Sequence, residues 1–161
     1  MTTGSFKNEG TKWLVPGSFD TVLSAEVKRA VRARTFLSLV AVEVRRVWDG
    51  LTVAADDQTL TELTDILWRE VRDTDLLVQA ERGTLWLVLL DADVDGSRRV
   101  IERVVSRIDS YRFSTAISIV MGAACCPTHA ADPDSLKREA VSRPMLSARR
   151  HVHPDASTDR P

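Results

Sequence analysis

The sequence of 161 residues contains only two cysteines, no long apolar run and no excess of charge of either sign. Cys125 and Cys126 are adjacent, and a disulfide between neighbouring residues requires strained geometry, so we expect two reduced thiols. If these residues continue a strand, their side chains point to opposite faces, which predicts one packed and one exposed thiol.

No apolar run approaches the ~18 residues that a membrane span requires, and the N-terminus lacks the basic and apolar regions of a signal peptide. We therefore expect a cytoplasmic protein without a membrane partner. The 22 basic and 23 acidic residues give a formal net charge of -1 at pH 7. Because such a chain has no global field that attracts phosphate backbones, we expect no nucleic-acid partner.

The composition, with 43% hydrophobic and 28% charged residues, is typical of one globular domain. A chain of this length buries roughly 70% of its surface on folding, so its core needs neither disulfides nor a structural metal. Both ends are polar and lack sustained periodicity. We expect a flexible segment at 1–16, a domain at 17–150 and a flexible tail at 151–161.

Hydrophobic spacing predicts helices and strands in alternation. The predicted helices cover 19–33, 56–72, 97–109 and a segment from about 134 that should break near Pro144. The predicted strands cover 36–44, 76–80, 85–90 and 113–124, and the middle two form a hairpin. This order predicts an α+β fold with a βαββαβ arrangement, a ferredoxin-like mixed sheet with helices packed mainly on one face.

Three strings stand in order at the second helix and hairpin, the third helix and the last strand: RDTDLLVQAERGTLWLVLL, IERV and STAISIVMGAACCP. They resemble the RxxD sequence with its hairpin, the following helix and the late strand of the GGDEF domain. This family comprises bacterial diguanylate cyclases, which condense two GTP molecules into cyclic di-GMP. The resemblance covers about 17–150 and implies the nucleotide-cyclase form of the βαββαβ fold.

The positions that bind metal in this family carry no carboxylate here. Where the family's hairpin turn has two glycines and two acids, the alignment places Arg82, Gly83, Thr84 and Leu85. In the first strand, Val40 falls on the metal-binding aspartate, and a slip of one residue gives Ala41. Trp48 and Asp57 fall on the two guanine-contacting positions, of which only Asp57 matches.

Phosphoryl transfer in this family depends on metal ions that neutralise the triphosphate charge. We therefore predict that the chain is not an enzyme and holds no metal or other cofactor. Glu43 and Glu81 lie near the relevant elements, but the sequence favours their interpretation as solvated surface carboxylates.

Arg72 and Asp75 match the family's RxxD inhibitory site, where the resemblance implies binding of cyclic di-GMP, and Arg103 matches a second arginine of that site. Arginine can bind phosphate or the O6/N7 edge of guanine bidentately, and a carboxylate can accept from guanine N–H groups. The alternative interpretation is structural: an arginine and an aspartate at a helix end that balance the helix dipole and face solvent.

The sequence favours a catalytically inactive GGDEF-like domain that acts by binding a protein partner or by self-association, with Trp48 as the favoured surface anchor. The alternative is a cyclic di-GMP receptor that uses Arg72, Asp75 and Arg103. An active diguanylate cyclase is the least favoured of the three. The residues ahead of Gly17 are too few for a sensory domain of ~50 residues, so we expect any signal to arrive through a separate molecule.

Overall fold

The computed structural model describes residues 12–14, 16–80, 83–142 and 149–152. Its helices are a short 3-10 helix η1 (Pro16–Ser18), α1 (Phe19–Ala33), α2 (Asp57–Glu70), α3 (Val94–Ser110) and α4 (Pro133–Ser142). Its strands are β1 (Lys12–Leu14), β2 (Leu37–Trp48), β3 (Leu51–Ala54), β4 (Leu76–Gln79), β5 (Thr84–Leu90), β6 (Ile117–Cys126) and β7 (Arg149–Val152).

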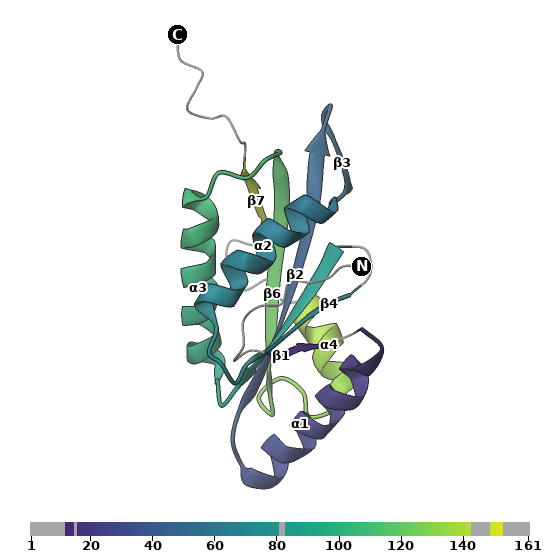
Figure 1. Ribbon diagram of the computed structural model, residues 1–161. Helices are drawn as coiled ribbons and strands as arrows, with labels where there is room; N and C mark the ends of the chain where they lie inside the picture. The colour runs from purple at the N-terminus through teal and green to yellow at the C-terminus, as the bar shows by residue number, and fades with distance from the viewer. Residues whose placement is uncertain (1–11, 15, 81–82, 143–148, 153–161) are drawn as a thin grey trace.

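The strands form one sheet in the order β1-β4-β5-β2-β6-β7, and β3 pairs with β2 off this path (Figure 1). The β1–β4 pairing is parallel, and the other described pairings are antiparallel. The central run β2-α2-β4-β5-α3-β6 is the predicted βαββαβ arrangement. The predicted α+β fold is therefore confirmed.

Helices cover both faces of this sheet, whereas the sequence predicts cover mainly on one. Successive residues of a strand point to opposite faces, and β2 is buried continuously from Leu37 to Val42. Val40 and Val42 join the core under α2 and α3, whereas Leu39 and Ala41 join the core under α1 and α4. The reason for the difference is that this apolar strand needs cover on both sides.

β2 extends past the predicted end at residue 44 and turns back into β3 (Figure 1). Asp49 and Gly50 form the turn with φ values of 54° and 76°, and two positive φ angles are what a type I′ hairpin turn requires. Partner strands explain the extension, because β3 pairs with β2 from Arg45 to Trp48 and β6 pairs with it as far as Arg46. Arg45 and Arg46, which follow the predicted end of the strand, therefore lie within β2.

Two short strands lie in or across the segments predicted to be flexible. β1 falls within 1–16 and pairs with β4, and β7 crosses the predicted boundary after residue 150 and pairs with β6. Both pair with strands that are distant in sequence, so they leave little local periodicity. The predicted break near Pro144 lies outside the described residues.

Cys125 and Cys126 form no disulfide, as predicted, but both are buried. The predicted exposed thiol is wrong because both faces of the sheet are covered at the end of β6. The Cys125 thiol lies 3.8 Å from the Ala92 carbonyl oxygen, and Cys126 packs in the core under α1 and α4. Burial raises the pKa of the Cys126 thiol. Among the helices that the structure describes, none has the length and apolar character needed to cross a membrane.

Candidate functional site

The three residues of the predicted RxxD-type site meet at one end of the sheet. Arg72 follows the end of α2, Asp75 directly precedes β4, and Arg103 lies on α3. Together they line a cleft of about 350 Å³, whose wall also includes Glu70 and Arg99. Folding therefore brings together side chains from two helices and the turn after the first of them.

Asp75 is buried, and both of its carboxylate oxygens accept hydrogen bonds from backbone amides. The Arg72 amide donates to Oδ2 at 2.9 Å, and the Leu90 amide donates to Oδ1 at 3.1 Å. The Asp75 amide in turn donates to the Arg72 carbonyl oxygen at 3.0 Å. Asp75 thus fixes the turn after α2 to the end of β5, and its oxygens are occupied by the protein itself.

The Arg72 guanidinium lies over the same stretch of backbone. Its Nη2 donates to the Leu90 carbonyl oxygen, and its Nε lies 3.7 Å from Asp75 Oδ2 with the Arg72 side chain 60% exposed. A guanidinium carries five N–H donors, so bonding to Leu90 leaves donors that face solvent. Arg72 is held in place and can still bind an anion.

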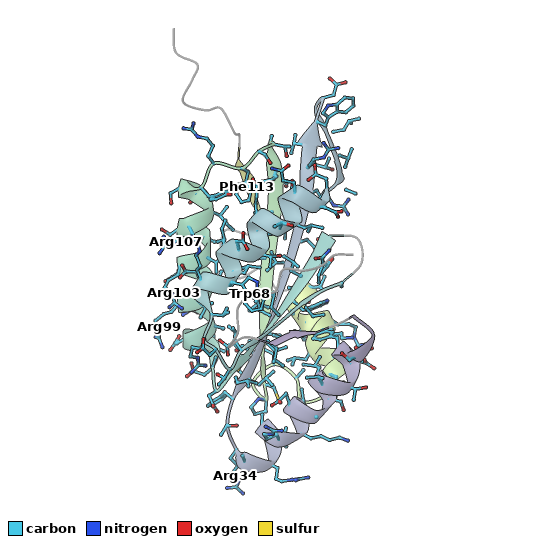
Figure 2. The ribbon with its side chains drawn as sticks, in the orientation of Figure 1. Arg34, Trp68, Arg99, Arg103, Arg107 and Phe113 are labelled. Carbon is cyan, nitrogen blue, oxygen red and sulfur yellow. The ribbon has the colours of Figure 1, made fainter. Side chains whose placement is uncertain are left out.

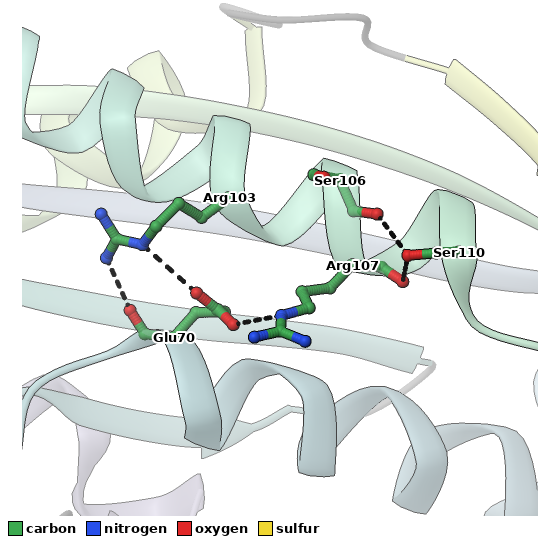
Figure 3. A network of polar contacts seen from close by, with 5 residues as sticks. All are labelled: Glu70, Arg103, Ser106, Arg107 and Ser110. Atoms are coloured by element: carbon green, nitrogen blue, oxygen red, sulfur yellow. Dashed lines mark hydrogen bonds and ion pairs between the residues drawn. The ribbon is translucent and has the colours of Figure 1, made fainter.

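Glu70 joins two arginines of α3 (Figure 3). Arg103 donates from Nε to Glu70 Oε1 at 3.2 Å and from Nη2 to the Glu70 carbonyl oxygen at 2.9 Å. Arg107 donates from Nε to Glu70 Oε2 at 2.9 Å. The Glu70 side chain is only 8% exposed, so the two arginines compensate a carboxylate that would otherwise be buried without a partner.

Glu70 escapes prediction from the sequence, because its partners lie on another helix and no local pattern links them. The arginines themselves recur at every fourth position of α3: Arg99, Arg103 and Arg107 (Figure 2). Residues four apart share one face of a helix. Of the three, Arg99 and Arg103 line the cleft, and Arg107 lies one turn beyond it.

Two further carboxylates line the cleft. Asp93 caps the start of α3, where its Oδ1 accepts from the Gly96 amide at 2.8 Å. Asp91 directly follows β5 with φ 57°, and among the described residues its carboxylate has no hydrogen-bond or ion-pair partner. Asp91 is therefore the carboxylate of the cleft that is available to a ligand.

The residues aligned with the family's metal-binding acids lie in the sheet or at the turn between β4 and β5. Val40 and Ala41 are buried in β2, and Leu85 is buried in β5. Thr84 is half-buried and pairs with Glu43 of β2. A carboxylate of the central strand therefore stands opposite the first residue of β5.

Gly83 brings the backbone of this turn close to β2. Its φ is 80°, and a Cβ at this position would come within 2.8 Å of the Val44 carbonyl oxygen. Arg82, the neighbouring aligned position, lies outside the described residues. The turn thus packs directly on the residue next to Glu43.

The two positions aligned with guanine contacts lie on different elements. Asp57 is the first residue of α2. Trp48 is 62% exposed at the far end of β2, roughly 17 Å beyond Glu43 at the rise of an extended strand. Of the predicted residues, the structure therefore gathers Arg72, Asp75 and Arg103 in one cleft and does not join Trp48 to the Gly83 turn.

No family model matches the sequence, and no curated protein matches it. Solved structures do match. The GGDEF domain of TpbB, also called YfiN, from Pseudomonas aeruginosa is 21% identical, with 84% of each chain covered and a TM-score of 0.69. The active GGEEF domain of a diguanylate cyclase from Vibrio cholerae is 16% identical, covering 78% of this chain and 84% of that one, with a TM-score of 0.66. The structure of the coiled coil and GGDEF domain of DgcB from Caulobacter crescentus, in complex with cyclic di-GMP, is 15% identical. The match covers 82% of this chain and 74% of the DgcB chain, with a TM-score of 0.65.

The prediction that the chain is not an enzyme is wrong, because enzymes share this fold, among them the active domain from Vibrio cholerae. The prediction depended on the absence of carboxylates at the positions that the alignment placed at Val40, Ala41 and the hairpin. In the structure the β4–β5 turn packs against β2 beside Glu43. The alignment with the family's motif therefore does not by itself establish which carboxylates lie near the β4–β5 turn.

The sheet order and the helices on both faces belong to an architecture that the matching structures share over most of their length. The protein has the fold of the GGDEF domains of diguanylate cyclases.

Proposed function

We propose that this GGDEF-fold chain acts in cyclic di-GMP signalling by binding cyclic di-GMP in the cleft of Arg72, Asp75 and Arg103. One observation carries the proposal: three arginines, Arg72, Arg99 and Arg103, line a single cleft with exposed side chains. The cleft volume of about 350 Å³ lies within the range of small-molecule sites.

The chemistry of arginine suits this ligand. Cyclic di-GMP offers two phosphodiester anions and two guanine edges, and a guanidinium binds either group bidentately. Arg72 is fixed at the end of β5, and Arg103 is fixed by Glu70. Because both side chains are held before the ligand arrives, binding loses less conformational entropy.

Asp75 supports the site from behind rather than touching the ligand. Its oxygens bond to the amides of Arg72 and Leu90, and its side chain is 2% exposed. The RxxD pair therefore acts through Arg72, with Asp75 as the positioning residue. The DgcB structure, which shares the fold, holds cyclic di-GMP, and this supports the choice of ligand.

Calorimetric titration of the protein with cyclic di-GMP tests the proposal. We expect saturable binding that Arg103→Ala weakens by about 10- to 100-fold, because a charge-assisted hydrogen bond contributes ~1.5–3 kcal/mol. Arg107→Ala is the matched control, since Arg107 bonds to the same Glu70 but does not line the cleft. An absence of binding, or equal weakening by both variants, would overturn the proposal.

A second candidate function is self-association through the β2–β3 hairpin. Trp48 and Leu51 flank its turn and are 62% and 63% exposed. Exposed aromatic and aliphatic side chains at one tip are typical of interaction anchors. This observation favours Trp48 as the contact residue that the sequence predicts.

Light scattering after size-exclusion chromatography tests self-association over a range of protein concentrations. We expect a dimer that Trp48→Ser dissociates. Val141→Ser, on α4, is the control because Val141 is also apolar and 57% exposed. A wild-type protein that stays monomeric at every concentration would exclude self-association. An equal effect of both variants would show that the hairpin is not the contact surface.

A further inference from the structure

A second hollow of about 120 Å³ adjoins the arginine-lined cleft. It lies between the end of α1, the residues that lead into β2 and the end of β5, and its walls include Arg29 and Leu37. Phe36 and Asp91 line both hollows. The two spaces are therefore neighbours, with one aromatic ring and one carboxylate between them.

Phe36 is an exposed aromatic residue at this junction. Its neighbour Leu37 is 1% exposed, but Phe36 is 42% exposed, and the other described phenylalanines, Phe19 and Phe113, are buried. An exposed ring beside an arginine-lined cleft provides a flat surface on which a nucleobase can stack. Such stacking changes affinity by about 5- to 150-fold per base.

Asp91 is placed by the arginine site itself. It follows Leu90, whose amide bonds to Asp75 and whose carbonyl oxygen bonds to Arg72. The left-handed backbone at φ 57° directs the chain from β5 toward α3, a conformation that aspartate tolerates better than most residues. The carboxylate is unpaired among the described residues, and Asp91 lines both hollows.

We infer that Phe36 and Asp91 form a guanine-base subsite beside the arginines, an inference that rests on the function proposed above. The arginines hold the phosphates, the Phe36 ring stacks on the base, and the Asp91 carboxylate accepts from the base edge. An ionised carboxylate is an acceptor only. Guanine presents two adjacent donors, N1–H and the N2 amino group, whereas adenine presents one amino donor beside an acceptor nitrogen. The subsite therefore selects guanine over adenine.

Titrations with cyclic di-GMP and cyclic di-AMP test this inference. We expect the wild type to bind cyclic di-GMP at least about tenfold more tightly than cyclic di-AMP. Asp91→Asn should remove most of this preference, and asparagine retains the left-handed backbone. Phe36→Ala should weaken binding of both dinucleotides by about tenfold, and Phe36→Tyr should retain wild-type affinity because it keeps the ring. Thermal melting checks that each variant is folded.

Arg103→Ala separates this inference from the proposed function. It should weaken binding of both dinucleotides and leave the preference for guanine unchanged. If Arg103→Ala weakens binding but the Phe36 and Asp91 variants bind like the wild type, the subsite is overturned and the arginine site stands. If the wild type binds neither dinucleotide, the proposed function and the subsite both fail.

Discussion

Asp75 and Arg72 form one unit with the end of β5, because the aspartate bonds to two backbone amides and the arginine bonds to the carbonyl oxygen of Leu90. The RxxD-type motif therefore also has a structural role, because it holds the turn after α2 against the end of β5. Removing the Asp75 carboxylate would leave two amides at the turn without their acceptor, a loss of ~1–3 kcal/mol each if they stay buried. These hydrogen bonds hold Arg72 in its position beside the cleft.

Gly83 has no room for a side chain. Its φ of 80° is left-handed, and an added Cβ would stand 2.8 Å from the Val44 carbonyl oxygen. We expect Gly83→Ala to lower the free energy of unfolding by more than the ~1–2 kcal/mol of the left-handed backbone alone. Urea denaturation measures this loss.

Gly50→Ala is the matched control for that substitution. Gly50 also has a positive φ, 76°, but a Cβ added there would meet nothing within 4 Å. Gly50→Ala should therefore show the backbone cost without the clash. Equal losses in the two variants would show that the turn does not pack on β2 as described.

α1 and β4 illustrate what the sequence predicts at the scale of single elements. The apolar spacing over 19–33 predicts α1 at its observed bounds, because helix periodicity is a property of one continuous segment. The strand predicted at 76–80 matches β4 to within one residue, since its apolar run is also continuous. β1 and β3 escape prediction because each is defined by its partner strand.

The candidate site likewise contains some residues that the sequence predicts and others that it does not. Arg72, Asp75 and Arg103 are predictable because they match spaced motif positions. Glu70 and Phe36 are not, since the first gains its role from a helix distant in sequence and the second from a hollow between separate elements. Local pattern cannot reveal contacts that only the tertiary fold creates.

Asp56 gives α2 a pH-dependent start. Its carboxylate accepts from the Thr59 amide at 2.9 Å as the N-cap, and hydrogen bonds from Thr59 hold the pKa of Asp56 below its ordinary value of 3.8. Because the pKa of Asp56 is lower in the folded state than in the unfolded state, the stabilisation that its ionised carboxylate provides is complete above the unfolded-state pKa. It is lost as the pH falls through the lower, folded value.

We expect Asp56→Asn to flatten the rise in the free energy of unfolding between about pH 2 and pH 5, because asparagine caps without titrating. Chemical denaturation at several pH values measures this. Asp57→Asn makes the same chemical change one residue later and leaves the cap in place. If the two variants have the same pH profile, the cap does not carry the effect.

At the scale of the whole molecule, the cleft includes Phe36, directly before the start of β2, whereas the β2–β3 hairpin lies at the other end of that strand (Figure 1). β2 has 12 residues, which corresponds to roughly 36 Å of extended chain between its two ends. Substitutions at such distant sites with no shared partners act independently. Ligand binding and self-association can therefore be tested separately in one protein.

Contacts between the two helices on one face of the sheet hold the walls of the cleft together. α2 and α3 pack on one face of the sheet, and Glu70 links them through Arg103 and Arg107. Arg99 and Arg103 are thus placed by α3, and Arg72, in the turn after α2, is placed by its hydrogen bond to the Leu90 carbonyl oxygen. A site built on rigid elements needs little rearrangement to bind a ligand.

The most direct test of ligand binding by the arginine-lined cleft is the affinity of cyclic di-GMP for the wild type and for the double variant Arg72→Ala/Arg103→Ala, measured by calorimetry. We predict saturable binding to the wild type and no measurable binding to the folded double variant. Wild-type-like affinity in the double variant, or no heat of binding with the wild type, would contradict the assignment of the site.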